Sequence, residues 1–180
     1  MTNPIPVWVD DVLTPFDKLD AHRLGLRHKA VSVFVLQSEK MLLQRRALGK
    51  YHTPGLWANT CCTHPDWEEA SVDCAVRRLK EELGITGLTP EFRHNLEYRA
   101  DVGNELIEHE VVDVFVAEAP ADISVTPNPD EVMATRWVDF RTLREELSAM
   151  PDNFTPWLKI YMTDYCDHIF GASAGGAQPG

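Results

Sequence analysis

Two cysteines and one histidine stand close together in the stretch NTCCTHP, residues 59–65. Adjacent side chains of an extended strand point to opposite faces. Cys61 and Cys62 should therefore face different sides, whereas Cys62 and His64 should share one. Structural zinc sites usually separate paired ligands by two to four residues, and a disulfide between neighbours would be strained. Two interpretations remain: thiols that only fill the core, or a reactive Cys62 beside a histidine with a separate task.

A second stretch, LIEHEVVDVFVA at residues 106–117, places two carboxylates on one side of a predicted strand. With a two-residue period, Glu108 and Glu110 continue a face whose next members are Val112, Val114 and Val116. Unpaired buried carboxylates cost several kcal/mol each, and two on one face repel each other. A bound metal ion would remove both difficulties. Alternatively, the strand emerges into solvent at its start and both glutamates are hydrated.

Three histidines supply the remaining ligands that such a metal ion would need. His22 and His28 precede a predicted strand, and His64 follows the cysteines. Three imidazoles with Glu108 and Glu110 suit an octahedral Mn²⁺ or Mg²⁺, or a distorted Zn²⁺. The other histidines are expected to be ordinary surface residues: His52, His94, His109 and His168.

The elements that must position these residues follow from the hydrophobic pattern. Strands are expected at residues 30–37 and 41–46, forming a hairpin, and at 57–63, 92–99, 106–117 and 136–139. Helices are expected at 66–83, stopped by Gly84, and at 140–149. A last helix should begin with Thr155 as N-cap and Pro156 in its first turn, and run to about residue 170. Strands and helices mix without regular alternation, which predicts one α+β or sandwich-like α/β domain over residues 1–170.

Composition and charge narrow the class of partner. The net charge of −11 argues against nucleic acid or an anionic membrane as a partner. No apolar run reaches membrane-spanning length and no signal peptide is apparent, so a cytoplasmic location with reduced cysteines is expected. The cluster RRALGK at residues 45–50 is a local exception that suits a small anionic ligand. Residues 171–180, GASAGGAQPG, are expected to form a disordered tail.

Residues 63–85, THPDWEEASVDCAVRRLKEELGI, resemble the Nudix box, G-x5-E-x7-R-E-U-x-E-E-x-G-U with U aliphatic, and keep its 23-residue spacing. In a full box, three glutamates gather on one helix face and hold Mg²⁺ against a diphosphate. Here Thr63 replaces the glycine and Arg78 replaces the first of those glutamates, whereas Glu81 and Glu82 remain. An arginine at that position would bind the diphosphate. The alternative is a solvated helix with ion pairs such as Arg78 to Glu82.

These departures, together with other segments, resemble the type 1 isopentenyl-diphosphate delta-isomerase family. The supporting segments are WANTCCTHP, RRALGKYHTPGLW, YRADVGNELIEHEV and FTPWLKIY. The resemblance extends from about Val7 to Phe170. It implies a Nudix-type domain with a mixed β-sheet flanked by helices. It also implies metal-dependent interconversion of isopentenyl and dimethylallyl diphosphate, for isoprenoid biosynthesis, by protonation and deprotonation.

The resemblance also assigns roles to residues. Cys62 and Glu110 would exchange protons with the substrate, Tyr98 would hold their geometry, and Trp157 would face the cationic carbon. Which of Cys62 and Glu110 is the acid stays open. The metal ligands, for Mn²⁺, Mg²⁺ or Zn²⁺, would be His22, His28, His64, Glu108 and Glu110. The diphosphate would meet Lys18, Arg46, Lys50 and Arg78, with a second Mg²⁺ on Glu82.

Two other functions remain as alternatives. One is a Nudix hydrolase of a nucleoside diphosphate derivative, which a glutamate in place of Arg78 would favour. The other is a binding module without catalysis, against which Cys62, Glu110 and the histidine set argue. The expected partner is a small allylic or homoallylic diphosphate, with no nucleic acid and no membrane span. The chain is expected to be a monomer or weak dimer.

Overall fold

A computed structural model describes residues 4–171 of the chain, and these residues form an α+β domain around a mixed nine-stranded sheet. The strands are β1 (Ile5–Val9), β2 (Val12–Phe16), β3 (Arg27–Gln37), β4 (Lys40–Arg46), β5 (Trp57–Ala58), β6 (Cys61–Thr63), β7 (Glu91–Asp101), β8 (Ile107–Glu118) and β9 (Val132–Asp139). The helices are α1 (Lys18–Leu24), α2 (Ser71–Leu83), α3 (Phe140–Ala149), α4 (Pro156–Asp164) and α5 (Cys166–Phe170), with a 3-10 turn at Pro151–Asn153. The predicted disordered tail lies outside the described residues, apart from Gly171.

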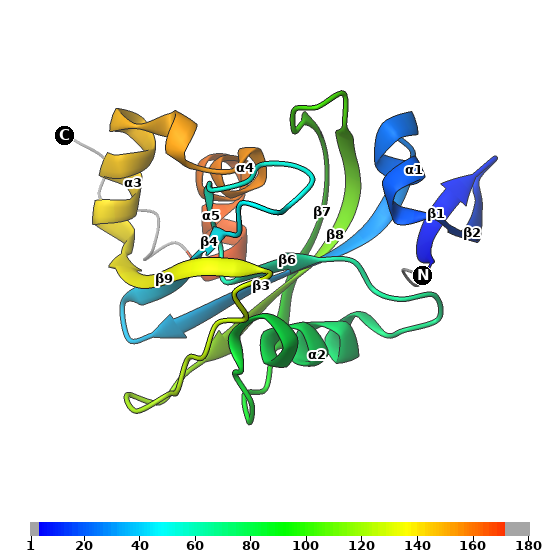
Figure 1. Ribbon diagram of the computed structural model, residues 1–180. Coiled ribbons are helices and arrows are strands. Elements are labelled where there is room, and N and C mark those ends of the chain that lie inside the picture. The colour runs from blue at the N-terminus through cyan, green and yellow to red at the C-terminus, as the bar shows by residue number, and fades with distance from the viewer. Residues whose placement is uncertain (1–3, 172–180) are drawn as a thin grey trace.

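Helices cover both faces of the sheet, as predicted. Figure 1 shows α2 on one side, and α4 and α5 on the other. The central strand β3 alternates between two cores: Val31 and Val33 pack with Leu79 of α2, whereas Phe34 packs with Tyr161 of α4. Because both of its faces are buried, β3 reads in the sequence as a continuous apolar run rather than an alternating one.

The pairing partners of β3 bring distant parts of the chain together. It runs antiparallel to β6 and β4 and parallel to β8, which in turn pairs with β7. The predicted hairpin of residues 30–37 and 41–46 is confirmed by the pairing of Leu36 with Met41. The helix predicted at residues 140–149 is also confirmed.

The single strand predicted at residues 57–63 is wrong, because two short strands occupy this stretch. Strand β5 pairs with β4, and β6 pairs with β3. Between them, the Asn59 amide donates to the backbone oxygens of Val33 and Cys61, and the Thr60 hydroxyl donates to that of Leu42. These side chains replace ladder hydrogen bonds, which lets the chain cross from one strand to the other.

Two predicted helices have different bounds. Helix α2 begins at Ser71 rather than at residue 66, because the five preceding residues form a turn and an irregular segment. It ends at Gly84 as predicted, with a φ of 64° that favours glycine. The last helix breaks at Tyr165 into α4 and α5, and Thr155 makes no side-chain capping bond.

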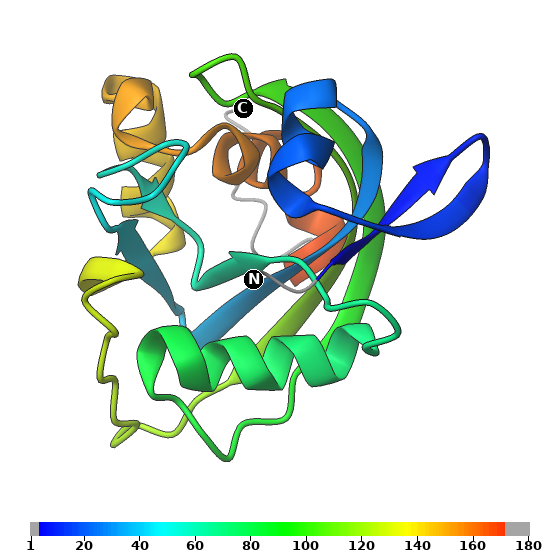
Figure 2. The same ribbon diagram turned by 45° about the vertical axis from the view of Figure 1, so that its right-hand side comes forward.

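The sequence analysis did not identify the first three elements. Strands β1 and β2 form a hairpin that projects from the rest of the domain (Figure 2), and α1 follows it. The Asp17 side chain caps the start of α1, and Gly25 ends it with a φ of 62°. Helix α1 matters for the site because it carries both Lys18 and His22. Within residues 4–171, no helix combines the length and apolar character needed to cross a membrane.

Candidate active site

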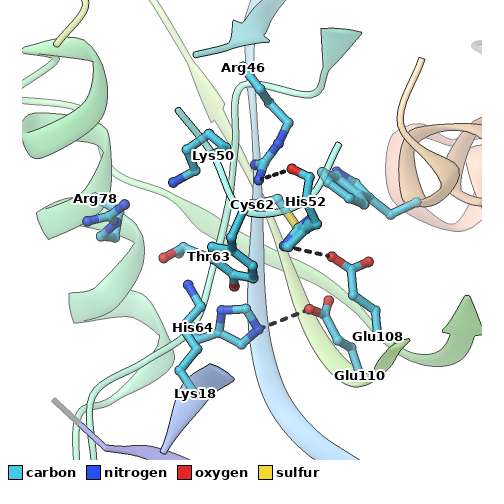
Figure 3. A pocket seen from close by; sticks show the side chains of 12 residues that line it. Lys18, Arg46, Lys50, His52, Cys62, Thr63, His64, Arg78, Glu108 and Glu110 are labelled. Atoms are coloured by element: carbon cyan, nitrogen blue, oxygen red, sulfur yellow. Dashed lines mark hydrogen bonds and ion pairs between the residues drawn. The ribbon is translucent and has the colours of Figure 1, made fainter. Parts of the chain in front are cut away.

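One pocket brings together residues from six of these elements, from the loop at residues 47–56 and from the segment after β6 (Figure 3). It contains all four cations predicted to bind a diphosphate and three of the four predicted catalytic side chains. Its lining consists of Lys18, Arg46, Lys50, Tyr51, His52, Cys62, Thr63, His64, Arg78, Glu108, Glu110 and Trp157. The fourth predicted catalytic residue, Tyr98, does not line the pocket but contacts both glutamates.

The predicted histidines and Glu110 form a compact cluster. The ligand atoms of His22, His28, His64 and Glu110 all lie within 4.8 Å of one another. The register of the sheet explains part of this arrangement, because His28 on β3 lies opposite Glu110 on β8. His64 Nε2 is 3.0 Å from Glu110 Oε1, and His28 Nε2 is 3.6 Å from the same oxygen.

The histidine ring nitrogens show that this cluster suits a cation. Nδ1 of His22 donates to the Lys18 carbonyl, and Nδ1 of His28 donates to the Leu26 carbonyl, each at 2.7 Å. Nε2 of both rings is therefore an unprotonated acceptor, buried and without a hydrogen-bond partner. Burial and the neighbouring His28 lower the pKa of His22 to about 4, so the ring is neutral at pH 7. Free lone pairs beside carboxylates fit a divalent metal ion.

The two glutamates are buried rather than hydrated, with exposed fractions of 2% for Glu108 and 1% for Glu110. The Tyr98 hydroxyl lies 2.8 Å from Oε2 of each. A phenol has one proton, so it can donate to only one carboxylate, and the other contact needs a carboxyl proton. Burial and the charge of Glu110 raise the pKa of Glu108 well above its usual value, which assigns that proton to Glu108. Burial opposes ionisation of Glu110, but the neighbouring His28 and His64, the latter with Nε2 3.0 Å from Oε1, outweigh it and lower its pKa.

The two adjacent cysteines face opposite sides, as predicted. Cys61 is buried in the core beneath α2, whereas Cys62 lines the pocket with His64. Burial, followed by the charge of Glu110, raises the pKa of Cys62 well above its usual value, so its thiol holds its proton. All four cysteines are free thiols; Cys74 packs in the same core as Cys61, and Cys166 packs in the core on the other face of the sheet.

Two of the predicted diphosphate-binding cations have no carboxylate partner among residues 4–171. The Arg46 guanidinium lies 5.3 Å from the centre of the Trp157 ring and donates to the His52 carbonyl. The Lys18 ammonium lies 5.6 Å from the centre of the Tyr51 ring. Burial and the neighbouring cations, Lys50 first, lower the pKa of Lys18 to about 8. An anion in the pocket would relieve this repulsion.

The other two cations are already paired with acids. Lys50 forms an ion pair with Glu131, and Arg78 lies 3.5 Å from the same carboxylate. Arg78 also pairs with Glu82 at 2.7 Å and with Glu81 at 2.9 Å. The ion pair of Arg78 with Glu82, which the sequence analysis kept as an alternative, therefore exists, but in the wall of the pocket.

Glu82 does not join the histidine cluster. Its Oε1 accepts from Arg78, and its Oε2 accepts from the Gln44 amide at 2.9 Å. A cation bound to Glu82 would have to take the place of Arg78 at Oε1.

His52 is the functional candidate that the sequence analysis missed, because it was assigned to the surface. Its exposed fraction is 4%, and it lines the pocket. The loop at residues 47–56 folds over the pocket and carries it inward. In the sequence, the position of His52 beside the cation cluster RRALGK was the one available sign of a functional role. The remaining histidines behave as expected: His94 and His109 are partly exposed and His168 is exposed.

The fold and this pattern of residues agree with comparisons to known proteins. Residues 26–158 match the family model described as the NUDIX domain. The crystal structure of DR0079 from Deinococcus radiodurans has a TM-score of 0.71, over 89% of this chain and 97% of that chain, at 14% identity. A MutT NUDIX hydrolase from Burkholderia pseudomallei has a TM-score of 0.57, over 77% and 98%, at 23% identity. The chain belongs to the Nudix family.

Curated relatives identify the branch of that family. The isopentenyl-diphosphate Delta-isomerase of Cereibacter sphaeroides is 64% identical over 171 residues, which cover 95% of this chain and 97% of that protein. Proteins of the same name are 64% identical in Ruegeria pomeroyi, over 93% of both chains, and 60% identical in Dinoroseobacter shibae, over 97% and 99%. Within the Nudix family, the chain therefore belongs with the isopentenyl-diphosphate Delta-isomerases.

Proposed function

We propose that this enzyme interconverts isopentenyl and dimethylallyl diphosphate in the pocket around Cys62 and Glu110. In the forward direction, a proton adds to the terminal alkene carbon and the tertiary carbon acquires cationic character. A proton then leaves the neighbouring methylene carbon, and the double bond forms there. The diphosphate is unchanged, so the reaction needs one acid, one base and shelter from water.

The two proton-transfer groups are Cys62 and Glu110. They come from β6 and β8, which pair with β3 on its two sides. The Cys62 thiol holds a proton, and the pKa of Glu110 lies below its usual value, so the pocket offers one donor and one acceptor. Tyr98 orients Glu110 through its hydrogen bond and can pass a proton between the carboxylates. This donor and acceptor in one buried pocket is the observation that carries the proposal.

The histidine cluster is proposed to hold a divalent cation. The ligands are His22, His28, His64, Glu108 and Glu110, and the candidates are Mn²⁺, Mg²⁺ and Zn²⁺. When bound, such a cation keeps both carboxylates ionised and tunes the acidity of Glu110. The orphaned Nε2 atoms of His22 and His28 support this assignment.

The cations on the other side of the pocket are proposed to bind the diphosphate. Lys18 and Arg46 have no carboxylate partner in the part of the chain that the structure describes, and Lys50 and Arg78 would exchange theirs for phosphate oxygens. Release of Glu82 from Arg78 would leave its carboxylate available for a Mg²⁺ that accompanies the diphosphate. Trp157 lines the pocket and would stabilise the cationic carbon by about 2 kcal/mol if the contact excludes water.

Nuclear magnetic resonance in D₂O tests the reaction class. The purified protein is incubated with isopentenyl diphosphate, and carbon and phosphorus signals are followed together. We expect dimethylallyl diphosphate with deuterium in a methyl group, and no released phosphate. Released phosphate would instead identify a hydrolase, and an unchanged substrate with measurable binding would identify a binding module. The finer expectations, a monomer or weak dimer in the cytoplasm, are proposals that sedimentation and cell fractionation can test.

A further inference from the structure

His52 lies within reach of Glu108, one of the two buried glutamates. Its Nε2 is 3.7 Å from Glu108 Oε1, a contact that Figure 3 marks. Its ring stacks on that of His22, with centroids 5.7 Å apart and an angle of 21° between the planes. The ligand atoms of His22, His52 and Glu108 all lie within 4.8 Å of one another.

The hydrogen bonds of His52 leave its inner nitrogen available. Nδ1 lies 3.1 Å from the Thr53 hydroxyl, which can accept a hydrogen bond from it. In that tautomer Nε2 carries a lone pair that faces Glu108. A neutral imidazole next to a carboxylate is the arrangement that metal sites use.

We propose that His52 is a further metal ligand, which enlarges the site to four imidazoles and two carboxylates. This inference rests on the proposed metal site. Ligand atoms about 2.1 Å from one metal ion lie about 3–3.5 Å apart in octahedral or tetrahedral arrangements, so a contact of 3.7 Å needs only a small closure. A fourth nitrogen favours Co²⁺ or Zn²⁺ over Mg²⁺, which prefers oxygen.

The position of His52 in the chain gives this ligand a second consequence. It lies two residues from Lys50, and its carbonyl accepts a hydrogen bond from Arg46 at 3.2 Å. Lys50 and Arg46 belong to the proposed diphosphate site. A bond between His52 and the metal would therefore fasten the loop at residues 47–56, and metal occupancy would order part of the substrate site.

Packing offers another explanation for a buried His52. Its ring contacts Tyr51 and Trp157 edge to face, with centroids 4.5 and 5.8 Å apart. If His52 only packs, its substitution should affect the metal-free protein as much as the metal-bound protein. If His52 is a metal ligand, its substitution should affect the metal-bound protein above all. This difference defines the test.

The test titrates metal-free protein with Co²⁺ and follows its visible absorption. His52→Ala should weaken Co²⁺ binding at least about 10-fold, since loss of an outer-shell partner alone costs that much. Its absorption should also change, because one nitrogen is missing. His28→Ala, the positive control, should lose binding. His109→Ala removes a histidine from the opposite face of the same strand as Glu108 and should bind as the unmodified protein does.

A second measurement follows the loop itself. Trypsin cleavage of the Lys50–Tyr51 bond, detected by mass spectrometry, should slow when Co²⁺ binds the unmodified protein but not His52→Ala. Circular dichroism of the metal-free variants checks folding, with His52→Gln as a bulkier substitute. Unchanged Co²⁺ affinity and absorption in a folded His52 variant would overturn this inference alone. Unchanged affinity in His28→Ala as well would overturn the whole metal site.

Discussion

The pocket has two halves that differ in burial and pairing. The catalytic half consists of His22, His28, His64, Glu108, Glu110 and Cys62. The cation half consists of Lys18, Arg46, Lys50 and Arg78. The histidines and glutamates of the catalytic half are buried, and within residues 4–171 some of its ring nitrogens have no hydrogen-bond partner. The cation half lies around the rim on a helix start, a strand end, a loop and α2, and two of its members already have carboxylate partners.

This difference indicates what each half can do. Buried groups with unmet hydrogen-bonding capacity are costly unless a ligand completes them, so the catalytic half suits the permanently bound metal ion that we propose. The paired cations, Lys50 and Arg78, can exchange one anion for another at small cost, so they suit a ligand that must enter and leave. Substitutions in the catalytic half should therefore mainly lower kcat, and those in the cation half should mainly raise KM.

The largest effect should follow from removal of a metal ligand. His28→Ala or Glu108→Ala should release the metal and lose activity together, by more than the ~10²-fold expected for one positioned acid or base. Metal analysis of the purified variants, alongside turnover, measures both quantities. Full metal content with unchanged turnover would remove these residues from the site.

The two adjacent cysteines allow a comparison of a pocket residue with a core residue of the same strand. Cys62→Ala should reduce isomerisation at least ~10²-fold, since it removes a proton-transfer group. Cys61→Ala should leave most activity, because that side chain is buried in the other core. Steady-state rates of both variants give the result. The reverse pattern would mean that the catalytic thiol is Cys61.

A smaller, pH-dependent effect should appear in the cation half. Since the pKa of Lys18 is about 8, Lys18 is protonated below that pH and loses its charge above it. Binding of inorganic pyrophosphate should therefore weaken as the pH rises from 7 to 9. Lys18→Met should bind pyrophosphate more weakly at pH 7 and show a shallower pH dependence than the unmodified protein. The titration of pyrophosphate itself affects both proteins equally. Parallel pH profiles would exclude Lys18 from anion binding.

The catalytic half was easier to predict from sequence than its surroundings. The two-residue period of a strand is local, so it placed Glu108 with Glu110 and separated Cys61 from Cys62 correctly. The burial of His52 depends on how a loop folds against Glu108, which is 56 residues away in the chain, and no local pattern encodes that contact. Helix α1 has only seven residues, too few for a clear period, although two residues that it carries were predicted.

Charge alone pointed to the cluster RRALGK, but the set of four cations was identified only through the resemblance of its segments to a known family. Its lysines and arginines look like surface charge in any single segment, and their convergence depends on tertiary structure. No local pattern predicts that Glu131 pairs with both Lys50 and Arg78, since these residues lie 81 and 53 positions away in the chain.

Steady-state kinetics of Arg78→Ala and Glu110→Gln, measured side by side with phosphate release, test the separation of the two halves most directly. Arg78→Ala should raise KM for isopentenyl diphosphate with a smaller change in kcat, and Arg78→Glu should raise KM further without creating efficient hydrolysis. Glu110→Gln should lower kcat by ~10²-fold or more. An unchanged KM in Arg78→Ala, or a Glu110→Gln variant altered only in KM, would contradict the division of roles.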